Sequence, residues 1–404
     1  MFLRFKMNVR SEIEIVTFTT LYPNSIQPNH GVFVETRLRQ LLATGYVASR
    51  VVAPVPWFPF SSPAAGSYAR YAKVPREERR ADIRIAHPRY VVLPKIGMSL
   101  TPHSLYRAAL PALRRLQAER DFDLIDAHYF YPDGVAAVRL GQALNKPVVI
   151  TARGSDVNLI PNFTRQRRMI LNAAEKAAGV IAVSQALKEA MVALGMAPEK
   201  IAVLRNGVDT GLFRQLDAGK WRSVARGANT IVLSVGNLLY SKGHDLVIRA
   251  LKDLPGDTHL LIAGEGPERR AFEELTGTLG LKDRVHFLGS VRHAEMPALY
   301  SAADVLVLAT EREGWPNVLL EAMACGTPVV ASKVGGIPEI VTSPEAGIML
   351  DSRSAESIAT AIKALLAARK SREAVRAHAL NYGWSDIVEG QIEFYRKAAG
   401  AVAV

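Results

Sequence analysis

Short apolar runs, rich in β-branched residues, alternate with longer helical stretches along almost the whole chain, and this alternation most constrains the fold. The runs are nearly continuous, as expected of strands that are buried on both faces of a parallel sheet. Parallel strands need crossover helices, so the pattern predicts α/β, doubly wound domains. The runs form two series, which cover residues 13–18, 49–55, 122–129, 147–153, 179–184 and 200–206, then 230–236, 259–266, 284–290, 304–310, 328–334 and 347–351.

The two series meet near residues 205–213, "RNGVDTGLF", where an Asn-Gly turn is followed by a polar stretch. A chain of 404 residues is long enough for two or three domains. We therefore expect an N-terminal domain over residues 1–205, a C-terminal domain over 206–380 and a final segment over 381–404. Residues 56–80, rich in Pro, Ser and Arg, are predicted to form a mobile surface loop.

The composition, 49% apolar and 22% charged, is that of an ordinary globular protein. The single cysteine, Cys325, excludes an internal disulfide, suits a reducing cytosol and is expected to be a small core residue. No run of about 18 apolar residues occurs, so we expect no membrane-spanning helix. The first residues, "MFLRFKMNVR", lack the long apolar stretch of a secretory signal. We expect a cytoplasmic protein that is a monomer or a weak dimer.

The net charge of +12 is concentrated in the first half of the chain. Residues 1–205 hold 28 Lys and Arg against 15 Asp and Glu, whereas residues 206–404 hold 22 against 23. This half favours an anionic partner, such as a phospholipid surface on the inner face of the plasma membrane, a phosphorylated acceptor or nucleic acid. A basic surface without a specific partner is the alternative. Nucleic acid is the weakest of these options because no recognisable reader module is present.

Residues 165–178, "RQRRMILNAAEKAA", have a basic amphipathic pattern that could dock on an anionic membrane. The alternative is a helix that packs its apolar side in the core and shows its arginines to water. The sequence leaves these two interpretations open.

In open α/β sheets, ligands bind beyond the carboxyl ends of the strands, so the residues that follow each run are candidates. Lys242, next to a glycine and a predicted helix start, outlines a phosphate site, although such a lysine can also be merely solvated. Gly264 and Gly266 would let the backbone come close to a ligand, or would simply form a βα turn.

The stretch 311–330, "EREGWPNVLLEAMACGTPVV", places two acids around a predicted helix start. Pro316 suits the first position of a helix, whose N–H groups could face a diphosphate or sugar hydroxyls. Glu313 is expected in the loop and Glu321 on the second turn of the helix. Carboxylates accept paired hydrogen bonds from vicinal hydroxyls, which favours a sugar ligand. Alternatively, Glu321 only complements the helix dipole, and Glu311 is expected to be a solvent-facing acid.

In the first half of the chain, polar residues also follow three predicted strands. His128 ends one run, Arg153 and Asp156 follow the next, and Gly31 lies at the turn from the first run into a helix. A lone histidine is often structural, but three such clusters favour a binding cleft that faces the second domain.

Taken together, these stretches resemble the retaining family-4 glycosyltransferases, which have the GT-B architecture of two facing Rossmann-like domains with parallel sheets. The resemblance covers nearly the whole chain and is most specific in its second half. The final segment is similar to the C-terminal helix of that family, which crosses back to the first domain, with Trp384 and Tyr395 as packing anchors. The stretches that carry the resemblance are "VLRNGVDTGLF", "SVGNLLYSKGHDLVI", "LLIAGEGPER", "VHFLGSV" and "EREGWPNVLLEAMACGTPVVASKVGGIPEIV".

The resemblance implies a nucleoside-diphosphate sugar that is held mainly by the second domain. Glu321 then matches the residue that binds the ribose hydroxyls, Glu313 the acid beside the transferred sugar, and Lys242 a cation on the diphosphate. The implied donor-binding residues are Glu321, Gly236, Asn237, Lys242, Gly264, Gly266, Trp315, Asn317, Val318 and Leu319.

The same resemblance implies roles in the first domain. His128 matches a histidine close to the transferred sugar, so that His128, Glu313 and Lys242 form the implied catalytic set. Asp156 matches a sugar or acceptor contact, and Gly31 matches a loop that lets diphosphate and acceptor approach.

Three positions depart from the pattern of the family. Asn237 stands where many relatives carry an arginine, so Lys242 or Arg153 would have to supply that positive charge. His30 precedes Gly31 where paired glycines are common, and its side chain is expected to project into that loop. Pro316 stands where glycine is usual.

The implied reaction is transfer of a hexose, with retention, from a UDP- or GDP-sugar to a hydroxyl acceptor, with a lipid-linked or cell-surface polysaccharide as in many bacterial relatives. Lys242 and helix N-termini would carry the charge of the leaving diphosphate, so we expect no metal and no cofactor. Front-face attack, with the departing phosphate oxygen as base, is favoured over a covalent Glu313 intermediate. A GT-B sugar-nucleotide epimerase, a phosphorylase and a non-enzymatic sugar-nucleotide sensor are the alternatives.

Overall fold

The computed structural model describes residues 12–58, 69–92 and 97–400. Two expectations fall on residues outside the described ranges. They are the lack of a secretory signal in the first residues and most of the loop predicted between residues 56 and 69. Among the helices of the described part, none combines the length and the apolar character needed to cross a membrane.

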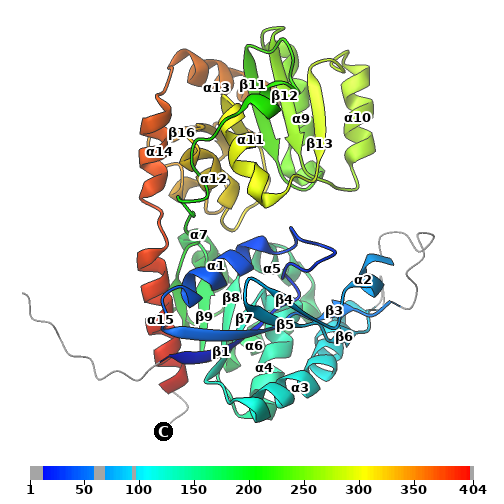
Figure 1. The fold of residues 1–404 in the computed structure, drawn as a ribbon, viewed down its shortest axis with the longest axis vertical. Helices are drawn as coiled ribbons and strands as arrows, with labels where there is room; N and C mark the ends of the chain where they lie inside the picture. Colours follow the sequence, from blue (N-terminus) through cyan, green and yellow to red (C-terminus); the bar gives the residue numbers. More distant parts are fainter. Residues whose placement is uncertain (1–11, 59–68, 93–96, 401–404) are drawn as a thin grey trace, which may run out of the picture. The chain divides into compact units, whose positions relative to one another are not determined.

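The chain forms two compact units, each with its own parallel sheet (Figure 1). The first unit comprises Met1–Ile181, Val192–Ala202 and Val388–Val404, and the second comprises Ala182–Met191 and Val203–Ile387. This division differs from the predicted boundaries at residues 205 and 380 in two respects. A short segment before the predicted seam joins the second unit, and most of the final helix joins the first.

The first unit is built on an eight-stranded sheet with the strand order β10-β9-β8-β7-β1-β2-β5-β4. Its central pairs are parallel, as the buried apolar runs predict, and the antiparallel β4–β5 pair closes one edge. A separate two-stranded ribbon joins β3 (Val55–Pro56) to β6 (Arg89–Tyr90). The strands of the sheet are β1 (Ile13–Phe18), β2 (Val47–Val52), β4 (Glu77–Arg80), β5 (Ile83–Ala86), β7 (Leu124–His128), β8 (Val148–Ala152), β9 (Gly179–Ala182) and β10 (Ile201–Val203).

The prediction of a loop over residues 56–80 is wrong at its C-terminal end. There the chain forms α2 (Ala69–Lys73) and the edge strand β4, which pairs with β5. All four residues of β4 are charged, and none of them is buried. An edge strand can be built from charged residues because one side of it faces solvent, so it leaves no apolar run to detect.

Helices flank the sheet of the first unit, and α3 and α4 lie beside each other (Figure 1). In α6, Ile170, Ala173 and Ala174 are buried, while its arginines are exposed. The apolar side of this amphipathic helix is therefore in the core, as the second of the two interpretations expected. Besides α2, the helices of this unit are α1 (Val32–Leu42), α3 (Thr101–Glu119), α4 (Val135–Leu144), α5 (Ser155–Asn158), α6 (Thr164–Lys176) and α15 (Ser385–Gly400), whereas most of α7 (Gln185–Leu194) belongs to the second unit.

The second unit has a six-stranded parallel sheet with the order β13-β12-β11-β14-β15-β16. Its strands are β11 (Thr230–Val235), β12 (Thr258–Ala263), β13 (Val285–Gly289), β14 (Val305–Leu308), β15 (Val329–Ser332) and β16 (Gly347–Leu350). Its helices are α8 (Gly219–Arg222), α9 (His244–Ala250), α10 (Arg269–Thr278), α11 (Met296–Ala302), α12 (Asn317–Ala324), α13 (Ala355–Ala367) and α14 (Arg372–Leu380).

Buried aliphatic residues of the central strands pack against α9 and α13 to form the core of this unit. Cys325 is fully buried, which confirms the expectation of a core thiol. Trp384 and Tyr395 are buried as well, as expected of packing anchors.

Candidate functional site

The sheet of the second unit reverses its strand order between β11 and β14. The chain runs from β11 outward to β13 on one side, then returns to β14 and runs outward to β16 on the other. Loops that leave the carboxyl ends of two such strands diverge and open a crevice, where ligands bind in open α/β sheets. The backbone N–H of Glu311 donates to the carbonyl of Ser241 at 2.8 Å, so the loops after β11 and β14 lie together at this point.

Lys242 and Glu313, predicted as a diphosphate cation and a sugar-side acid, form an ion pair across these two loops. Their side chains are 26% and 15% exposed, so both are partly accessible to solvent while being held by their surroundings. A partly buried pair is screened less by salt than a surface pair. The structure thus brings together two predicted site residues that lie far apart in the sequence.

Gly335 and Gly336 hold the backbone of the Glu313 loop and were not anticipated as functional residues. A Cβ atom at Gly335 would lie 1.9 Å from the carbonyl oxygen of Glu313, and one at Gly336 would lie 2.5 Å from that of Gly314. Gly335 also has a φ of 52°, which side chains disfavour. In the sequence, the only sign of this close packing is the Gly-Gly pair after β15. The contact of this pair with Glu313 becomes visible only in the folded structure.

Helix α12 begins at Asn317, with Pro316 at its N-cap position. The Trp315 indole is 6% exposed and donates to the carbonyl of Asn206 at 2.9 Å. The side-chain amide of Asn206 donates to Asn317 at 3.1 Å. The first turn of α12 is therefore held by the segment that follows β10. The predicted roles of Trp315 and Asn317 in donor binding stay predictions.

Val318 and Leu319 continue the first turn of α12. The Leu319 side chain is fully buried, and its N–H donates to the carbonyl of Pro316 at 3.1 Å. Their predicted role in donor binding stays a prediction.

Glu321 lies on the second turn of α12, as expected, and accepts a hydrogen bond from the hydroxyl of Tyr300 at 2.8 Å. Burial raises the pKa of Glu321 to about 7, and the bond from Tyr300 offsets only part of this rise. The carboxyl group therefore titrates near neutral pH. Tyr300 lies on α11 and is fully buried, and no sequence pattern links it to Glu321.

The Gly236-Asn237 loop is fastened by His244. One ring nitrogen of His244 lies 3.2 Å from the carbonyl of Asn237, and the other lies 2.8 Å from the hydroxyl of Ser234. Burial lowers the pKa of His244 to about 4, so the ring is neutral. The Asn237 side chain is exposed, and it carries no charge where an arginine is common in the resembling family.

Gly264 and Gly266 approach the same loop. A Cβ atom at Gly264 would lie 1.8 Å from the carbonyl oxygen of Gly236, and one at Gly266 would lie 2.4 Å from that of Leu238. The two glycines therefore let the loops after β11 and β12 pack together. This packing accounts for both glycines without a ligand, and their predicted donor contact stays a prediction.

In the first unit, Gly31 occupies the N-cap position of α1 with a φ of 71°. A Cβ atom there would lie 2.2 Å from the carbonyl oxygen of Leu21, so the tight turn requires glycine. A ring nitrogen of His30 lies 3.0 Å from the carbonyl of Thr20. The His30 side chain thus folds back on the loop.

His128 ends β7 and is 2% exposed. Its Nε2 lies 2.9 Å from Oδ2 of Asp126, and its Nδ1 lies 2.5 Å from a guanidinium nitrogen of Arg153. Arginine can only donate, so Nδ1 accepts and the ring proton is assigned to Nε2. Burial, together with the charge of Arg153, lowers the pKa of His128, despite the opposite effect of Asp126. Both ring nitrogens are engaged, and the predicted contact with the transferred sugar stays a prediction.

Asp156 is fully buried, and its carboxylate accepts backbone N–H groups of Phe130, Arg153 and Gly154 at 2.8, 3.0 and 2.7 Å. Burial raises its pKa in spite of these bonds. Asp156 therefore ties the carboxyl end of β7 to that of β8. Its predicted contact with a sugar or acceptor stays a prediction.

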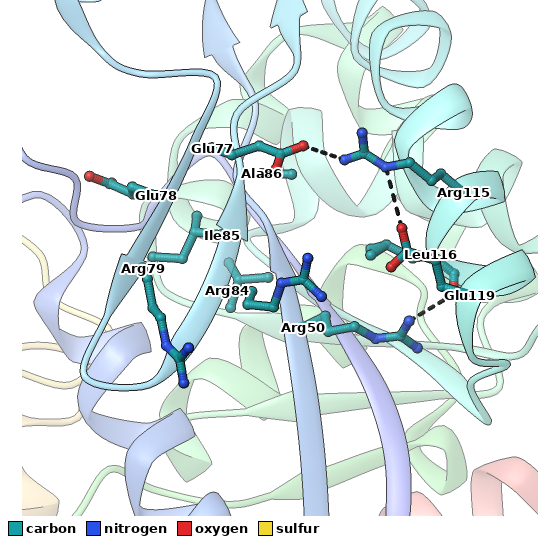
Figure 2. Close-up of a pocket in the computed structure, with 11 residues that line it drawn as sticks. Arg50, Glu77, Glu78, Arg79, Arg84, Ile85, Ala86, Arg115, Leu116 and Glu119 are labelled. Atoms are coloured by element: carbon teal, nitrogen blue, oxygen red, sulfur yellow. Dashed lines mark hydrogen bonds and ion pairs between the residues drawn. The ribbon is translucent and has the colours of Figure 1, made fainter.

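A hollow of about 340 Å³ lies away from these strand ends, between the β4–β5 hairpin and α3 (Figure 2). Its arginines are largely engaged within the unit. Arg115 pairs with Glu77 at 2.5 Å, and Arg50 donates to the carbonyl of Leu116 at 2.7 Å, near the end of α3. These charges neutralise one another or cap the helix, so we assign no ligand to the hollow. In the residues that the structure describes, no group of three or more His, Cys, Asp or Glu side chains is arranged to hold a metal ion.

Two family models match the chain, "Glycosyltransferase Family 4" over residues 68–212 and "Glycosyl transferases group 1" over residues 218–381. A D-inositol 3-phosphate glycosyltransferase of Acidothermus cellulolyticus is 32% identical over 315 residues, which cover 71% of this chain and 70% of that protein. The chain belongs to the group 1 glycosyltransferases. The fold predicted from the sequence, GT-B with two Rossmann-like domains, is confirmed.

Two further comparisons extend this assignment. TuaC of Bacillus subtilis, named as a teichuronic acid biosynthesis glycosyltransferase, is 29% identical over 360 residues, which cover 87% of this chain and 88% of TuaC. The crystal structure of Anabaena HepE in complex with UDP and glucose matches with a TM-score of 0.72 at 22% identity, over 95% of this chain and 99% of HepE. At this identity the structural likeness shows the fold alone.

The packing of Gly335 on the Glu313 loop leads to a first prediction for this glycosyltransferase. We expect Gly335→Ala to lower turnover about tenfold or more, because the added methyl group must push the Glu313 backbone out of place. The free energy of unfolding should fall by about 1–3 kcal/mol. Initial rates and denaturant unfolding measure the two effects. Gly256→Ala is the control, because nothing lies within 4 Å of a Cβ atom there. Equal rates for the two variants would contradict the role of Gly335.

Proposed function

We propose that this glycosyltransferase transfers a hexose, with retention, from a UDP- or GDP-sugar to a hydroxyl acceptor. The observation that carries the proposal is the Lys242–Glu313 pair at the point where the strand order of the second sheet reverses. Glu321, on the helix that follows β14, adds a carboxyl group suited to ribose hydroxyls. The complex of HepE with UDP and glucose is in keeping with such a donor.

The proposed donor places its diphosphate by Lys242 and by the first turn of α12. The ammonium group and the backbone N–H groups of a helix start stabilise charge that develops on the leaving phosphate. Glu313 holds Lys242 in place by the ion pair and lies beside the transferred sugar. In this scheme Asn237 contributes no charge to the diphosphate. The diphosphate therefore depends more strongly on Lys242 than it would if position 237 held an arginine. The scheme uses neither a metal nor another cofactor.

The proposed chemistry is front-face attack, in which the acceptor hydroxyl loses its proton to the departing phosphate oxygen. The bond from the anomeric carbon to that oxygen breaks as the bond to the acceptor oxygen forms on the same face. Glu313 is a poor candidate for a covalent nucleophile because its carboxylate is already paired with an ammonium group. Its part in the proposal is to orient Lys242 and the sugar hydroxyls.

The experiment that tests the proposal is incubation of the protein with UDP- and GDP-hexoses, with release of nucleotide and the anomeric configuration of the product as readouts. We expect Glu313→Gln to lower turnover about 100-fold or more. Glu311→Gln is the matched control, because Glu311 lies in the same stretch and makes only loose ion pairs with Arg312 and Arg353, at 3.7 and 3.4 Å.

Intact turnover and intact donor binding in Glu313→Gln would show that this site is assigned wrongly. An inverted product would refute the retaining mechanism. Donor binding without any transfer or hydrolysis would favour the sensor, and a changed sugar configuration on the nucleotide itself would favour the epimerase.

The raised pKa of Glu321 predicts that nucleotide binding depends on pH. The ionised carboxylate accepts ribose hydroxyls better than the neutral acid does, and the ionised fraction grows as the pH rises through about 7. We expect the Kd of the donor nucleotide to fall roughly tenfold between about pH 6 and pH 8. Calorimetric titration of UDP and GDP measures this change.

Two variants control for other titrating groups. Glu321→Gln should flatten the pH profile. Tyr300→Phe should move its midpoint to higher pH, because the Tyr300 hydroxyl lowers the pKa of Glu321. The same profile in Glu321→Gln as in the natural chain would exclude Glu321 as its source.

We also propose that the basic first unit docks on an anionic membrane to reach a lipid-linked or cell-surface polysaccharide acceptor. Arg165, Arg167 and Arg168 are exposed on α6, and the Phe163 side chain beside them is 52% exposed. Because the apolar side of α6 is buried, docking would rest on these charges and on aromatic contact rather than on insertion of the helix. The relation to TuaC is in keeping with such an acceptor.

Flotation with vesicles of phosphatidylglycerol and phosphatidylcholine tests the docking. We expect binding at low salt that weakens strongly at high salt. Exchange of the three α6 arginines for glutamine should reduce binding. The matched control exchanges three exposed cations of the second unit, Arg226, Arg270 and Lys363, and should bind like the natural chain. Binding that is absent at low salt would refute the docking.

A further inference from the structure

The first unit contains a row of neighbouring, mostly buried polar side chains that runs from the C-terminal helix to the end of β7 and then to the loop after β8. The members lie on α15, on α1, on β7 and directly after β8, and the sequence does not predict that they form one set. This buried polar chain consists of Arg37, Gln391, Tyr395, Asp126, His128 and Arg153.

The direction of each hydrogen bond follows from what the groups can donate. Nε of Arg37 donates to Oε1 of Gln391 at 2.6 Å. The amide nitrogen of Gln391 then faces Tyr395 and donates to its hydroxyl oxygen. The Tyr395 hydroxyl faces the carboxylate of Asp126 and lowers its pKa, while Oδ1 of Asp126 has no hydrogen-bond partner among the described residues. At this end of the chain, a single amide both accepts from an arginine and donates to a tyrosine.

The other end of the chain ends on the two predicted site residues of the first unit. Asp126 accepts the Nε2 proton of His128 at 2.9 Å, and Nδ1 of His128 accepts from Arg153 at 2.5 Å. The Arg153 guanidinium also lies over the ring of Phe33, 5.1 Å from its centroid. Phe33 and Arg37 are one turn apart on α1, so the same helix touches both ends of the chain.

The surroundings favour one protonation state of the two titrating members, Asp126 and His128. Burial would raise the pKa of Asp126, but the His128 ring, Tyr395 and Arg37 outweigh that effect and keep it below its usual value. A proton added to His128 would place a third positive charge beside Arg37 and Arg153. The arrangement therefore holds an ionised aspartate and a neutral histidine between two arginines.

We propose that Gln391 and Tyr395 of the C-terminal helix are positioning residues for glycosyl transfer, which act through Asp126 to fix the tautomer of His128 and the place of Arg153. The inference rests on the proposed function, since it assumes that the strand ends of the first unit take part in transfer. The groups of α15 touch no substrate in this scheme. They set the orientation of a ring and of a cation at the edge of the sheet, where small displacements are costly to catalysis.

A purely structural interpretation is that these buried groups only satisfy one another. It predicts that any equally destabilising change on α15 has the same effect on activity. The positioning proposal predicts a specific change at His128, and the two interpretations therefore differ in a measurable way.

The test compares Tyr395→Phe and Gln391→Met with Ile392→Val, a buried neighbour on α15 outside the chain. Nitrogen NMR of labelled histidine reports the tautomer of His128, and His128→Gln assigns its signal. We expect the neutral Nε2–H tautomer in the natural protein and a mixture of tautomers in the two chain variants. Turnover should fall about 10- to 100-fold in these variants, with the Kd of UDP or GDP changed less than about twofold.

Ile392→Val should leave both the His128 signal and turnover unchanged at a similar loss of thermal stability. An unchanged His128 signal in both chain variants would overturn the proposal, as would an equal loss of turnover in Ile392→Val. If the natural protein transfers no sugar from any donor, the proposed function fails on its own, and the NMR comparison still decides whether α15 positions His128.

Discussion

Parallel strands cannot be joined by tight turns, and this constraint shapes both units of the protein. Each connection must cross a face of the sheet, so all carboxyl ends emerge at one edge and the loops gather there. In the second unit, the strand order reverses between β11 and β14. Lys242 and Glu313 lie on the loops that follow these two strands, and they form an ion pair there. The chemistry of the site is thus a consequence of how the chain must return to its own sheet.

Two glutamates of one short stretch have different partners. Glu313 forms an ion pair with the ammonium group of Lys242. Glu321, eight positions later, is half-buried beside the neutral phenol of Tyr300, and partial loss of hydration raises its pKa to about 7. In the proposed scheme, the acid that balances a cation and the acid that accepts hydrogen bonds from ribose hydroxyls need these different surroundings.

Most of the strands, the parallel sheets and the helix start at Asn317 could be predicted from sequence because buried strands and helix caps leave local patterns, but β5 and β6 lie outside the predicted runs. The edge strand β4 could not, since its charged residues need no apolar run. The partners of the site residues were hidden for another reason. Tyr300, Gly335 and Gln391 act on residues far away in the sequence, and only the fold brings them into contact.

The burial of Cys325 has a practical consequence. It is the single cysteine of the sequence, it is fully buried, and burial raises its pKa to about 12. The thiolate that reacts with alkylating labels is therefore almost absent at neutral pH. A cysteine introduced at an exposed position would be the one reactive thiol of the protein. One such cysteine in each unit would allow a pair of spectroscopic labels to be attached without labelling Cys325.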